Sequence, residues 1–521
     1  MTNDTTAKAL EVIAAGAGVL MVGTLIGRVA GYGFRYMVAI ISPETLGIFS
    51  LCMTLLGIVS TVAFLGMKSG IVRYVAFYRG RQDSARIKGT ILTSLKLVLG
   101  MSIGVSVVVA LVAKPLALTF FHRPEAVTYV FFVALILPFY TAEFLLAKGL
   151  IAFKAVTYRV AVFDLSENLG KVLFCALLML LGLHVWAALL GYGLAIVASL
   201  VLALYFLEFR VFSIFRSPEA SIPNYGELIR YSTPLLFSGI IGFLLIWTDN
   251  LMLGYFLTLK DVGLYNGAAL LAFLVFMGNE FFIPLFFPSI SEMYGQGQNE
   301  GVRNLYFTVT KWSLAIGLPI CILLLIKPKA VLTFLFGPVY GVAAVALVFL
   351  SLGRLAASLS HTSTQMINMV EKTHYHFWVT LVTALVNLGL NAWWIPRYGI
   401  NGAAAATATA LFFQAVAFIW LAYREFGYHI FTPPIRKLVG VGASLGLVFV
   451  AVTGWGSPSL GVFLLTVAFF GFAYAGLGWA VGAVEDHDRL LWRIVKEKSS
   501  VWWSGGKAIA ADQESNHVTL G

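Results

Sequence analysis

Charged residues are scarce in this chain of 521 residues. Asp, Glu, Lys and Arg together make up 11%, whereas 60% of the residues are hydrophobic and the mean hydropathy is +0.89. Soluble domains usually carry about 25% charged residues. The composition therefore excludes a soluble globular protein and predicts a polytopic membrane protein.

Cysteine and the common enzyme signatures are also lacking. The three cysteines, Cys52, Cys175 and Cys321, fall inside apolar runs, which excludes a disulfide framework and a CxxC metal site. The sequence has no GxxxxGK[ST] or HExxH motif, and the GxSxG spacing occurs only inside apolar runs, at 100–104 and 442–446, so we expect no catalytic residues. The first ten residues carry one base, Lys8, and no small-residue cleavage pattern. We expect no cleaved signal peptide, so that the first span is retained.

Long apolar runs are what the sequence has in abundance. A membrane-spanning helix needs about 20 mostly apolar residues, and the chain predicts an all-α membrane protein with about 14 such helices. Their expected ranges are 12–40, 44–66, 89–112, 126–147, 160–182, 185–207, 232–257, 262–288, 306–326, 339–366, 376–395, 400–423, 437–455 and 459–483.

The basic residues predict the orientation. If the N-terminus is cytoplasmic, 23 of the 35 Lys and Arg residues fall on cytoplasmic segments and six on external loops, as the positive-inside rule requires. We therefore expect a plasma-membrane protein with both termini in the cytoplasm. The polar end after about residue 484 is either a helix at the inner interface or a partly disordered tail. Its Glu485-Asp-His-Asp488 run favours an exposed acidic cluster over a metal site.

Features of the chain repeat at an offset of about 216 residues. Pro43-Glu-Thr-Leu-Gly47 corresponds to Lys260-Asp-Val-Gly263, and Trp186-Ala-Ala corresponds to Gly402-Ala-Ala. Six spans per repeat place both copies on the membrane in the same sense, related by an axis along its normal, as in transporters with parallel repeats. We expect four regions: an N-terminal lobe (1–215), a C-terminal lobe (216–430), an extra helix pair (431–483) and a cytoplasmic tail (484–521).

Eleven charged residues lie within the expected spans, where each costs roughly 2.5–3.5 kcal/mol if unpaired at the centre. They should pair or line a watery interior, and several stand in stripes at helical spacing. The pair Glu167 and Lys171 has two interpretations, a local i,i+4 ion pair or part of the interior. The eleven residues are Arg28, Arg35, Lys96, Lys171, Lys311, Arg354, Glu143, Asp164, Glu167, Asp249 and Glu280. The stripes are Asp164, Glu167, Asn168 and Lys171; Ser238, Gly242 and Asp249; Arg354, Ser358, His361 and Gln365; and Thr380, Thr383, Asn387, Asn391 and Trp394.

The first span is the most informative. Arg28 and Arg35 share a face, while Gly23, Gly27 and Gly31 form a GxxxGxxxG stripe about a quarter turn away. If the glycines pack on a neighbouring helix, the arginines face the interior, where guanidinium groups suit phosphate oxygens. The alternatives are snorkelling toward the interface or bridges to carboxylates on other helices.

Two other intramembrane groups have competing interpretations. Asp249 is either an ion- or proton-binding acid or a buried carboxylate with satisfied hydrogen bonds. His361 either takes part in proton transfer or is a hydrogen-bonded cavity residue. His374 and His376 are two apart and do not share a helix face, which argues against a zinc site.

Several motifs resemble the oligosaccharide flippase branch of the multidrug/oligosaccharidyl-lipid/polysaccharide exporter superfamily. The resemblance covers about residues 1–425, and the order of the motifs is more specific than any one of them. The motifs are Gly27-Arg-Val-Ala-Gly31, Ile41-Ser-Pro-Glu-Thr-Leu-Gly-Ile-Phe49, Gly66-Met-Lys-Ser-Gly-Ile-Val-Arg-Tyr74, Tyr231-Ser-Thr-Pro234, Asp249-Asn-Leu-Met-Leu-Gly-Tyr-Phe256, Val262-Gly-Leu-Tyr265 and Pro396-Arg-Tyr-Gly-Ile-Asn-Gly-Ala-Ala404.

The resemblance implies a transporter without enzymatic activity that flips a lipid-linked oligosaccharide from the cytoplasmic to the outer leaflet by alternating access. It implies no cofactor and no nucleic acid, and it suggests glycan polymerases or glycosyltransferases as partners. It also implies a cation site, for sodium or a proton, although Asn391 replaces a carboxylate of the sodium-binding version. The expected substrate-binding residues are Arg28, Arg35, Lys96, Asp164, Lys171, Arg354 and His361. The expected ion-coupling residues are Asp249, Asn387, Asn391 and Thr407.

Two other functions compete with the flippase. A multidrug extruder of the same superfamily would bind organic cations and would need an acidic cavity, against which the arginines of the first span argue. A membrane enzyme of glycan assembly, a polymerase or ligase, would need a large external loop. The expected external loops are about fifteen residues or fewer.

Overall fold

The computed structural model describes residues 23–153, 155–216, 218–280, 297–370, 373–430 and 432–453, with single positions between 282 and 294 and short pieces between 471 and 480. Most of the expected span 459–483 therefore lies outside the described residues, and the tail 484–521 lies wholly outside them. The side chains of Ser238 and Gly242, in the expected stripe with Asp249, are also outside the description.

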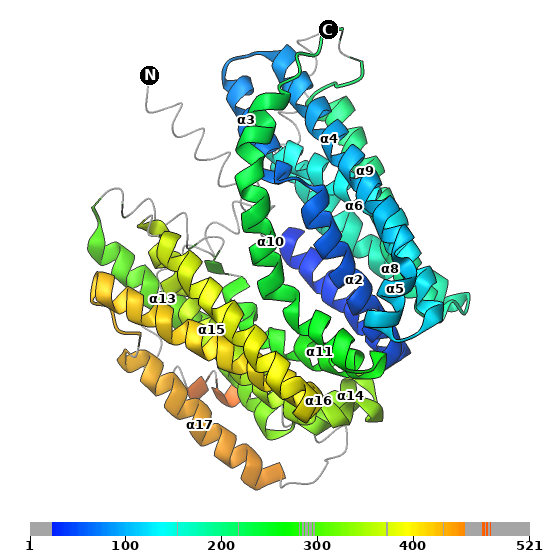
Figure 1. The fold of residues 1–521 in the computed structure, drawn as a ribbon. Helices are drawn as coiled ribbons and strands as arrows, with labels where there is room; N and C mark the ends of the chain where they lie inside the picture. Colours follow the sequence, from blue (N-terminus) through cyan, green and yellow to red (C-terminus); the bar gives the residue numbers. More distant parts are fainter. Residues whose placement is uncertain are drawn as a thin grey trace.

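The described chain is helical throughout, and no strand occurs in it (Figure 1). After a first helix at residues 23–41, the elements of the N-terminal half are α2 (Pro43–Ala63), α3 (Met67–Gly80), α4 (Ser84–Leu111), α5 (Ala113–Leu116), η1 (Ala117–Phe121), η2 (Pro124–Ala126), α6 (Val127–Ala152), α7 (Val156–Arg159), η3 (Val160–Ser166), α8 (Glu167–Leu180), α9 (His184–Phe206) and η4 (Leu207–Val211). Those of the C-terminal half are α10 (Tyr225–Phe256), α11 (Leu259–Phe273), η5 (Leu274–Phe276), α13 (Asn299–Ile326), α14 (Pro328–Phe336), η6 (Pro338–Ala343), α15 (Ala344–Met369), α16 (Thr373–Phe426) and α17 (Pro433–Thr453).

These helices confirm the all-α membrane class. Among the described residues, nine helices are long and apolar enough to cross a membrane. The expected spans 376–395 and 400–423 are the two helices that the label α16 covers, separated by a kink at Gly399 (φ 56°, ψ −136°), a backbone conformation that glycine adopts without strain. The count of fourteen stays a prediction.

The two halves use the same local chemistry at corresponding positions. Ser42 caps α2 by accepting a hydrogen bond from the Thr45 backbone N–H (3.0 Å). Thr258, 216 residues later, caps α11 through a capping box with Asp261. Caps of this kind satisfy backbone N–H groups that have no partner within the helix, so the repeat fixes where both helices begin.

The capped helices α2 and α11 pack against each other through residues related by the same offset. A Cβ added to Gly47 would lie 2.0 Å from the carbonyl oxygen of Leu259, and one added to Gly263 would lie 1.6 Å from that of Pro43. Position 43 corresponds to 259 and position 47 to 263, so the contact is reciprocal, as it is when two copies meet across a two-fold axis.

The lobes share one hydrophobic core at one end only of the described bundle. The shared cluster includes Phe34 and Phe49 of the first lobe and Tyr265 and Tyr340 of the second, and the Tyr340 hydroxyl donates to the Ala39 carbonyl (3.0 Å). At the other end, which carries the basic segment of α3, α10 still packs on α3 and places Leu228 in the cluster of the first lobe. The helices α13, α15 and α16 form separate clusters there, and Figure 1 shows them diverging from the first lobe. The structure is therefore closed at the end opposite the basic segments.

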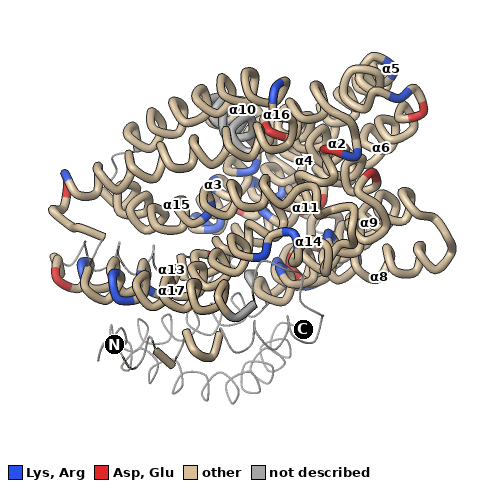
Figure 2. Tube along the Cα trace, turned by 90° about the horizontal axis from the view of Figure 1, so that it is seen from below, with Lys and Arg blue, Asp and Glu red and all other residues tan. Residues whose placement is uncertain are grey.

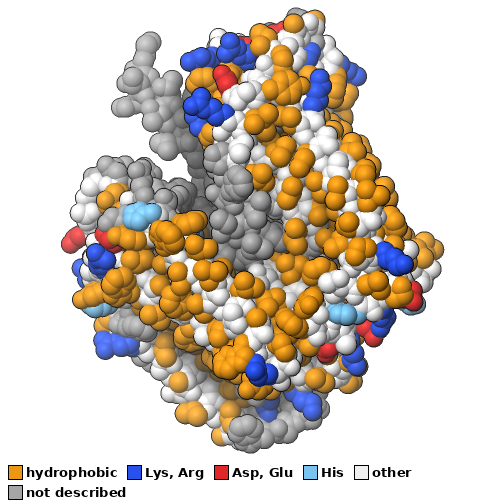
Figure 3. Space-filling view, in the orientation of Figure 1, with side chains coloured by type: hydrophobic (Ala, Val, Ile, Leu, Met, Phe, Trp, Pro, Cys, Tyr) orange, Lys and Arg blue, Asp and Glu red, His pale blue; other side chains and the backbone are white. Residues whose placement is uncertain are grey.

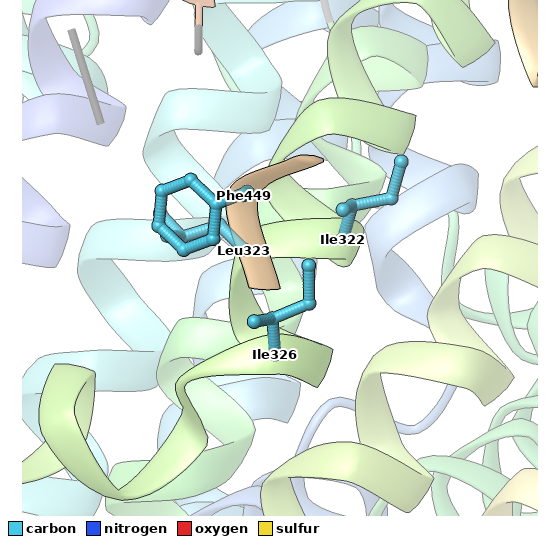
Figure 4. A pocket seen from close by; sticks show the side chains of 4 residues that line it. All are labelled: Ile322, Leu323, Ile326 and Phe449. Atoms are coloured by element: carbon cyan, nitrogen blue, oxygen red, sulfur yellow. The ribbon is translucent and has the colours of Figure 1, made fainter. Parts of the chain in front are cut away.

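The surface and the charges fit a membrane-embedded bundle. The face in Figure 3 is dominated by hydrophobic side chains, with Lys and Arg mostly toward its edges, over both lobes. Charged positions are sparse along the tube in Figure 2. The extra helix α17 packs on α13, where Gly442 and Gly446 admit Ile322. The shallow pocket there is lined by apolar side chains alone, Ile322, Leu323, Ile326 and Phe449 (Figure 4), and offers no polar group to a substrate.

Candidate functional site: charged residues between the two lobes

The glycine stripe of the first helix packs as expected. Added Cβ atoms on Gly23, Gly27 and Gly31 would meet Val160, Asp164 and Asn168 respectively, and the contact at Gly27 is 2.3 Å from a backbone oxygen. The glycines therefore seat the first helix closely on the segment 160–168 and leave the face with Arg28 and Arg35 exposed.

Arg28 connects the two lobes. Its guanidinium forms an ion pair with Glu280, and the arginine side chain is still 43% exposed. The expected alternative of a bridge to another helix therefore holds for Arg28, although the exposure leaves room for a second anion. Arg35 is exposed, and no carboxylate of the described chain lies within ion-pair distance of it.

Arg354 of α15 joins the two arginines of the first helix. Its guanidinium lies over the ring of Phe273 (5.2 Å), and Phe273 in turn contacts Tyr32 (5.9 Å between ring centroids). The charges of Arg28, Arg35 and Arg354 all act on the Tyr32 hydroxyl. The charges of three guanidinium groups from two lobes thus act on one residue. Within the described chain, Glu280 forms an ion pair with Arg28, and the charge of Asp249 acts on Arg354.

This arginine group lies at the edge of the shared core. On α15 the core ends at Leu350, one turn before Arg354, and on the segment after α11 it ends at Val275, five residues before Glu280. The group therefore stands where the lobes begin to separate, on the side of the basic segments. Positive charge between low-dielectric walls attracts anions strongly.

The expected stripe on α15 faces this region. Asn279 donates to the Ser358 hydroxyl (2.5 Å), and His361 contacts the edge of the Phe276 ring (5.1 Å between centroids). His361 therefore shares the face of Arg354 but lies farther from the shared core. The structure assigns no hydrogen bond to its ring within the described residues.

The charges of the fifth expected span are mostly paired within their own lobe. Asp164 accepts from Arg159 (2.5 Å) and from Thr24 (3.3 Å), and Lys171 forms an ion pair with Glu167. The segment 160–166 is π-helical, which brings together residues five apart. Arg159, which lies just before the expected span 160–182, therefore reaches Asp164. For Lys171 the local-pair interpretation agrees with the structure.

Lys96 lies apart from the arginine group. It is exposed on α4, on the face that also exposes Ile103 and Val107. That face carries apolar side chains outward, so the structure does not bring Lys96 to the other expected substrate residues.

The four expected ion-coupling residues meet at a single carboxylate. Asp249 accepts hydrogen bonds from Thr407 (2.6 Å), Asn391 (2.7 Å) and Tyr265 (2.8 Å). Asn387 accepts from Asn391 (3.0 Å) and donates to Thr407 (3.4 Å). Tyr265 was not among the expected ion-coupling residues. It lies sixteen residues after Asp249 and on the next helix, so helical periodicity within one segment does not relate the two.

The donor set of this group fits a small cation. Carboxylate, hydroxyl and amide oxygens are hard ligands, and the buried Asn391 Oδ1 has no hydrogen-bond partner within the described residues. Rotation of that amide would present a second oxygen beside Asp249. The group carries one formal negative charge, which suits a monovalent ion or a proton.

Fold and site together define an all-helical, two-lobed membrane transporter. The model of a family of polysaccharide biosynthesis proteins matches residues 13–294, more than half of the chain, and the protein belongs to that family.

Curated relatives agree with this assignment. The chain is 24% identical over 261 residues to an uncharacterized membrane protein of Methanocaldococcus jannaschii (49% of this chain, 50% of the relative). It is 23% identical over 190 residues to the probable low-salt glycan biosynthesis flippase Agl15 of Haloferax volcanii (36% and 40%). The chain thus spans half or less of the length of these relatives. The expected identification as a polysaccharide flippase of the exporter superfamily is confirmed.

Solved structures share the fold. The lipid II flippase MurJ in its inward closed conformation is similar with a TM-score of 0.68 at 12% identity, covering 88% of this chain and 97% of that chain. A multidrug resistance MATE transporter in an inward-facing conformation is similar with a TM-score of 0.56 at 16% identity (76% and 94%). These similarities of fold confirm the multi-pass membrane fold predicted from the sequence.

Proposed function

We propose that this protein moves a lipid-linked oligosaccharide, carried on a polyprenyl diphosphate or phosphate, from the cytoplasmic to the outer leaflet for the synthesis of cell-surface glycan. The observation that carries the proposal is the group of Arg28, Arg35 and Arg354, drawn from both lobes and placed where the lobes diverge. Forked guanidinium groups bind phosphate oxygens in pairs.

The arrangement supports alternating access. With the basic segments cytoplasmic, the described conformation is closed outside and receives its substrate from within. The diphosphate enters between the lobes and competes with Glu280 for Arg28, while the lipid tail stays in the bilayer. Loss of that ion pair loosens one link between the lobes and favours their rearrangement.

Two sources of driving force are available to this cycle. One charge that crosses 100 mV gains about 2.3 kcal/mol, so an anionic headgroup moving out of a negative interior moves downhill. The Asp249 group supplies the second source by binding a coupling cation, sodium or a proton, on the opposite lobe from the first helix.

A multidrug extruder is the second candidate, since the fold is shared with a multidrug transporter. Organic cations would require an acidic cavity, whereas the interior described here gathers three guanidinium groups around one tyrosine. The positive charge of this interior therefore favours the flippase over the multidrug extruder. An enzyme of glycan assembly has no support from the family or from the shared fold.

The test is transport of a fluorescent polyprenyl-diphosphate-linked sugar by the full chain in proteoliposomes. Arg28→Ala and Arg354→Ala should each slow the flip about 10- to 100-fold, because a hydrogen bond to a charged group contributes about 1.5–3 kcal/mol. Arg123→Ala removes an exposed arginine outside the group and should leave the rate unchanged. Unimpaired flipping in both interior variants, or drug efflux as the sole activity, would refute the proposal.

A further inference from the structure

Glu143, in the membrane-spanning helix α6, is a buried acid that the transport proposal does not use. Its side chain is 0% exposed, and neither carboxyl oxygen has a hydrogen-bond partner within the described residues. It lies between the shared core, which ends on α6 at Leu137, and the separate cluster of the first lobe, which begins at Leu145. Buried polar groups are nearly always paired, so this exception needs a physical explanation.

The charges around Glu143 do not balance. Within the described chain, those that act on it come from Arg159 of α7 and from Glu167 and Lys171 of α8. Arg159 is engaged by Asp164 (2.5 Å), and Lys171 by Glu167. Three carboxyl groups therefore face two cations, and Glu143 is the one left without a counter-ion.

The remaining titratable neighbours do not supply the missing charge. Two phenols, Tyr140 of α6 and Tyr192 of α9, are electrostatically coupled to Glu143. Lys68 of α3 and Lys148 of α6 lie against the Phe144 ring (4.7 and 5.5 Å), and neither acts on Glu143 in the described structure.

We propose that Glu143 is a proton-binding site in the first lobe: it carries a proton in this conformation and releases it when the helices around it move. An ionised carboxylate with no hydrogen-bond partner or counter-ion is too costly to bury. Binding of one proton from water forms a carboxyl O–H bond and removes the charge. The site is separate from the Asp249 group, which belongs to the other lobe.

The proton site is coupled to the arginine group through one residue. Tyr192 experiences the charges of Glu143, Glu167 and Arg35 together, and the Lys171 ammonium lies over its ring (4.7 Å). An anion bound at Arg35 adds negative charge near this network and favours the protonated form of Glu143. By thermodynamic reciprocity, a proton on Glu143 then favours binding of the anion. This linkage rests on the proposed function, whereas the proton site does not.

Infrared difference spectroscopy of the purified full-length protein in proteoliposomes tests the site directly. The wild type should show the C=O band of a protonated carboxylic acid at pH 7, well above the ordinary Glu pKa of about 4.3. Glu143→Gln should abolish that band, and Glu125→Gln, at an exposed position on η2, should retain it. A band that is absent from the wild type or unchanged in Glu143→Gln would overturn the proposal.

A second variant covers the case in which Glu143→Gln does not fold. Glu143→Asp keeps an acid at the position and should shift the same band in frequency. If the aspartate variant leaves the band in place, the protonated acid is another residue and the proposal fails.

Calorimetric titration with inorganic diphosphate in buffers of different ionisation enthalpy tests the linkage. At a pH where the infrared band of the wild type is half lost, the wild type should take up more protons per diphosphate bound than Glu143→Gln, by up to about half a proton, because anion binding raises the protonated fraction of Glu143. Equal proton uptake would overturn the linkage and leave the flippase proposal intact. Failure of the wild type to bind diphosphate would count against the flippase proposal, while the infrared band would still decide the proton site.

Discussion

At the scale of single residues, Asp249 is held by three hydrogen-bond donors, none of which is a carboxylic acid, and its partners in the described chain include no second carboxylate. Asn391→Asp would place two carboxylates in contact, since Asn391 Nδ2 lies 2.7 Å from Asp249 Oδ1. Like charges this close repel unless a cation binds between them. We expect the variant to gain sodium-dependent stability of about 1–3 kcal/mol at saturating sodium.

Thermal unfolding in sodium chloride and in choline chloride measures this gain. Asn299→Asp is the control, because it adds the same charge at the exposed start of α13. If sodium leaves the melting temperature of Asn391→Asp unchanged, the group is not a cation site of the kind described.

Lys68 provides a pH-dependent prediction outside the membrane-spanning segments. Burial, aided by the charge of Lys148, lowers the pKa of Lys68 to about 8, and its ammonium lies over Phe64 (4.0 Å). Between this pKa and the ordinary value of about 10.4, the unfolded chain binds a proton that the folded chain lacks. The contribution of this group to stability is therefore unfavourable below pH 8 and rises with pH across that interval.

Competitive acetylation followed by mass spectrometry can determine the pKa of Lys68. Its labelling should titrate with a midpoint near pH 8, below the ordinary lysine value of about 10.4. Lys148→Gln should raise the midpoint of Lys68. A midpoint near the ordinary lysine value of about 10.4 would contradict the prediction.

Sequence reasoning found part of the candidate site at this scale. Asp249, Asn387, Asn391 and Thr407 were expected together from the resemblance, and they meet in the structure. The Glu280 partner of Arg28 and the placement of Arg354 beside Tyr32 could not be derived. Both depend on contacts between lobes, which helical periodicity within one segment does not encode.

At the scale of elements, the first helix shows how small residues position functional ones. Gly27→Ala would push a methyl group to 2.3 Å from the backbone oxygen of Asp164, and a backbone atom cannot turn aside as a side chain can. Forced overpacking of this kind costs about 1–3 kcal/mol. We expect a lower melting temperature and weaker binding of diphosphate, because Arg28 is the next residue.

Gly33→Ala is the matched control on the same helix, since nothing lies within 4 Å of its added Cβ. It makes the same chemical change without the collision and should leave the melting temperature unaffected or slightly raised. Equal stability of the two variants would mean that the stripe does not seat the helix.

The presence of a membrane-spanning helix was easier to predict than a change of helical geometry within it. The GxxxGxxxG spacing correctly predicted a packed neighbour, because close helix contact needs small residues. The π-helical segment 160–166 and the separate helix α3 were not expected. An apolar run fixes the presence of a span, whereas a local change of helical pitch depends on packing against other elements.

At the scale of the whole molecule, the internal repeat could be inferred because both copies retain turn and capping residues at one offset, and Gly47 and Gly263, which are related by that offset, pack reciprocally. The sequence did not predict which end of the bundle is closed. That property comes from the relative placement of the lobes, and a transporter must adopt more than one placement with the same sequence.

The closed end gives the last prediction. Tyr36 and Phe336 belong to different lobes and their rings lie 5.6 Å apart, so a short bifunctional methanethiosulfonate reagent that links Tyr36→Cys to Phe336→Cys should lock the shared core shut. Transport should stop on cross-linking and recover on reduction. The control pair, Tyr129→Cys with Trp186→Cys, has a similar ring separation (5.5 Å) within one lobe and should cross-link without loss of transport. Because the native cysteines in the described chain are buried, they should not interfere. Continued flipping by the fully cross-linked first pair would show that the lobes do not separate at this end and would remove alternating access from the mechanism.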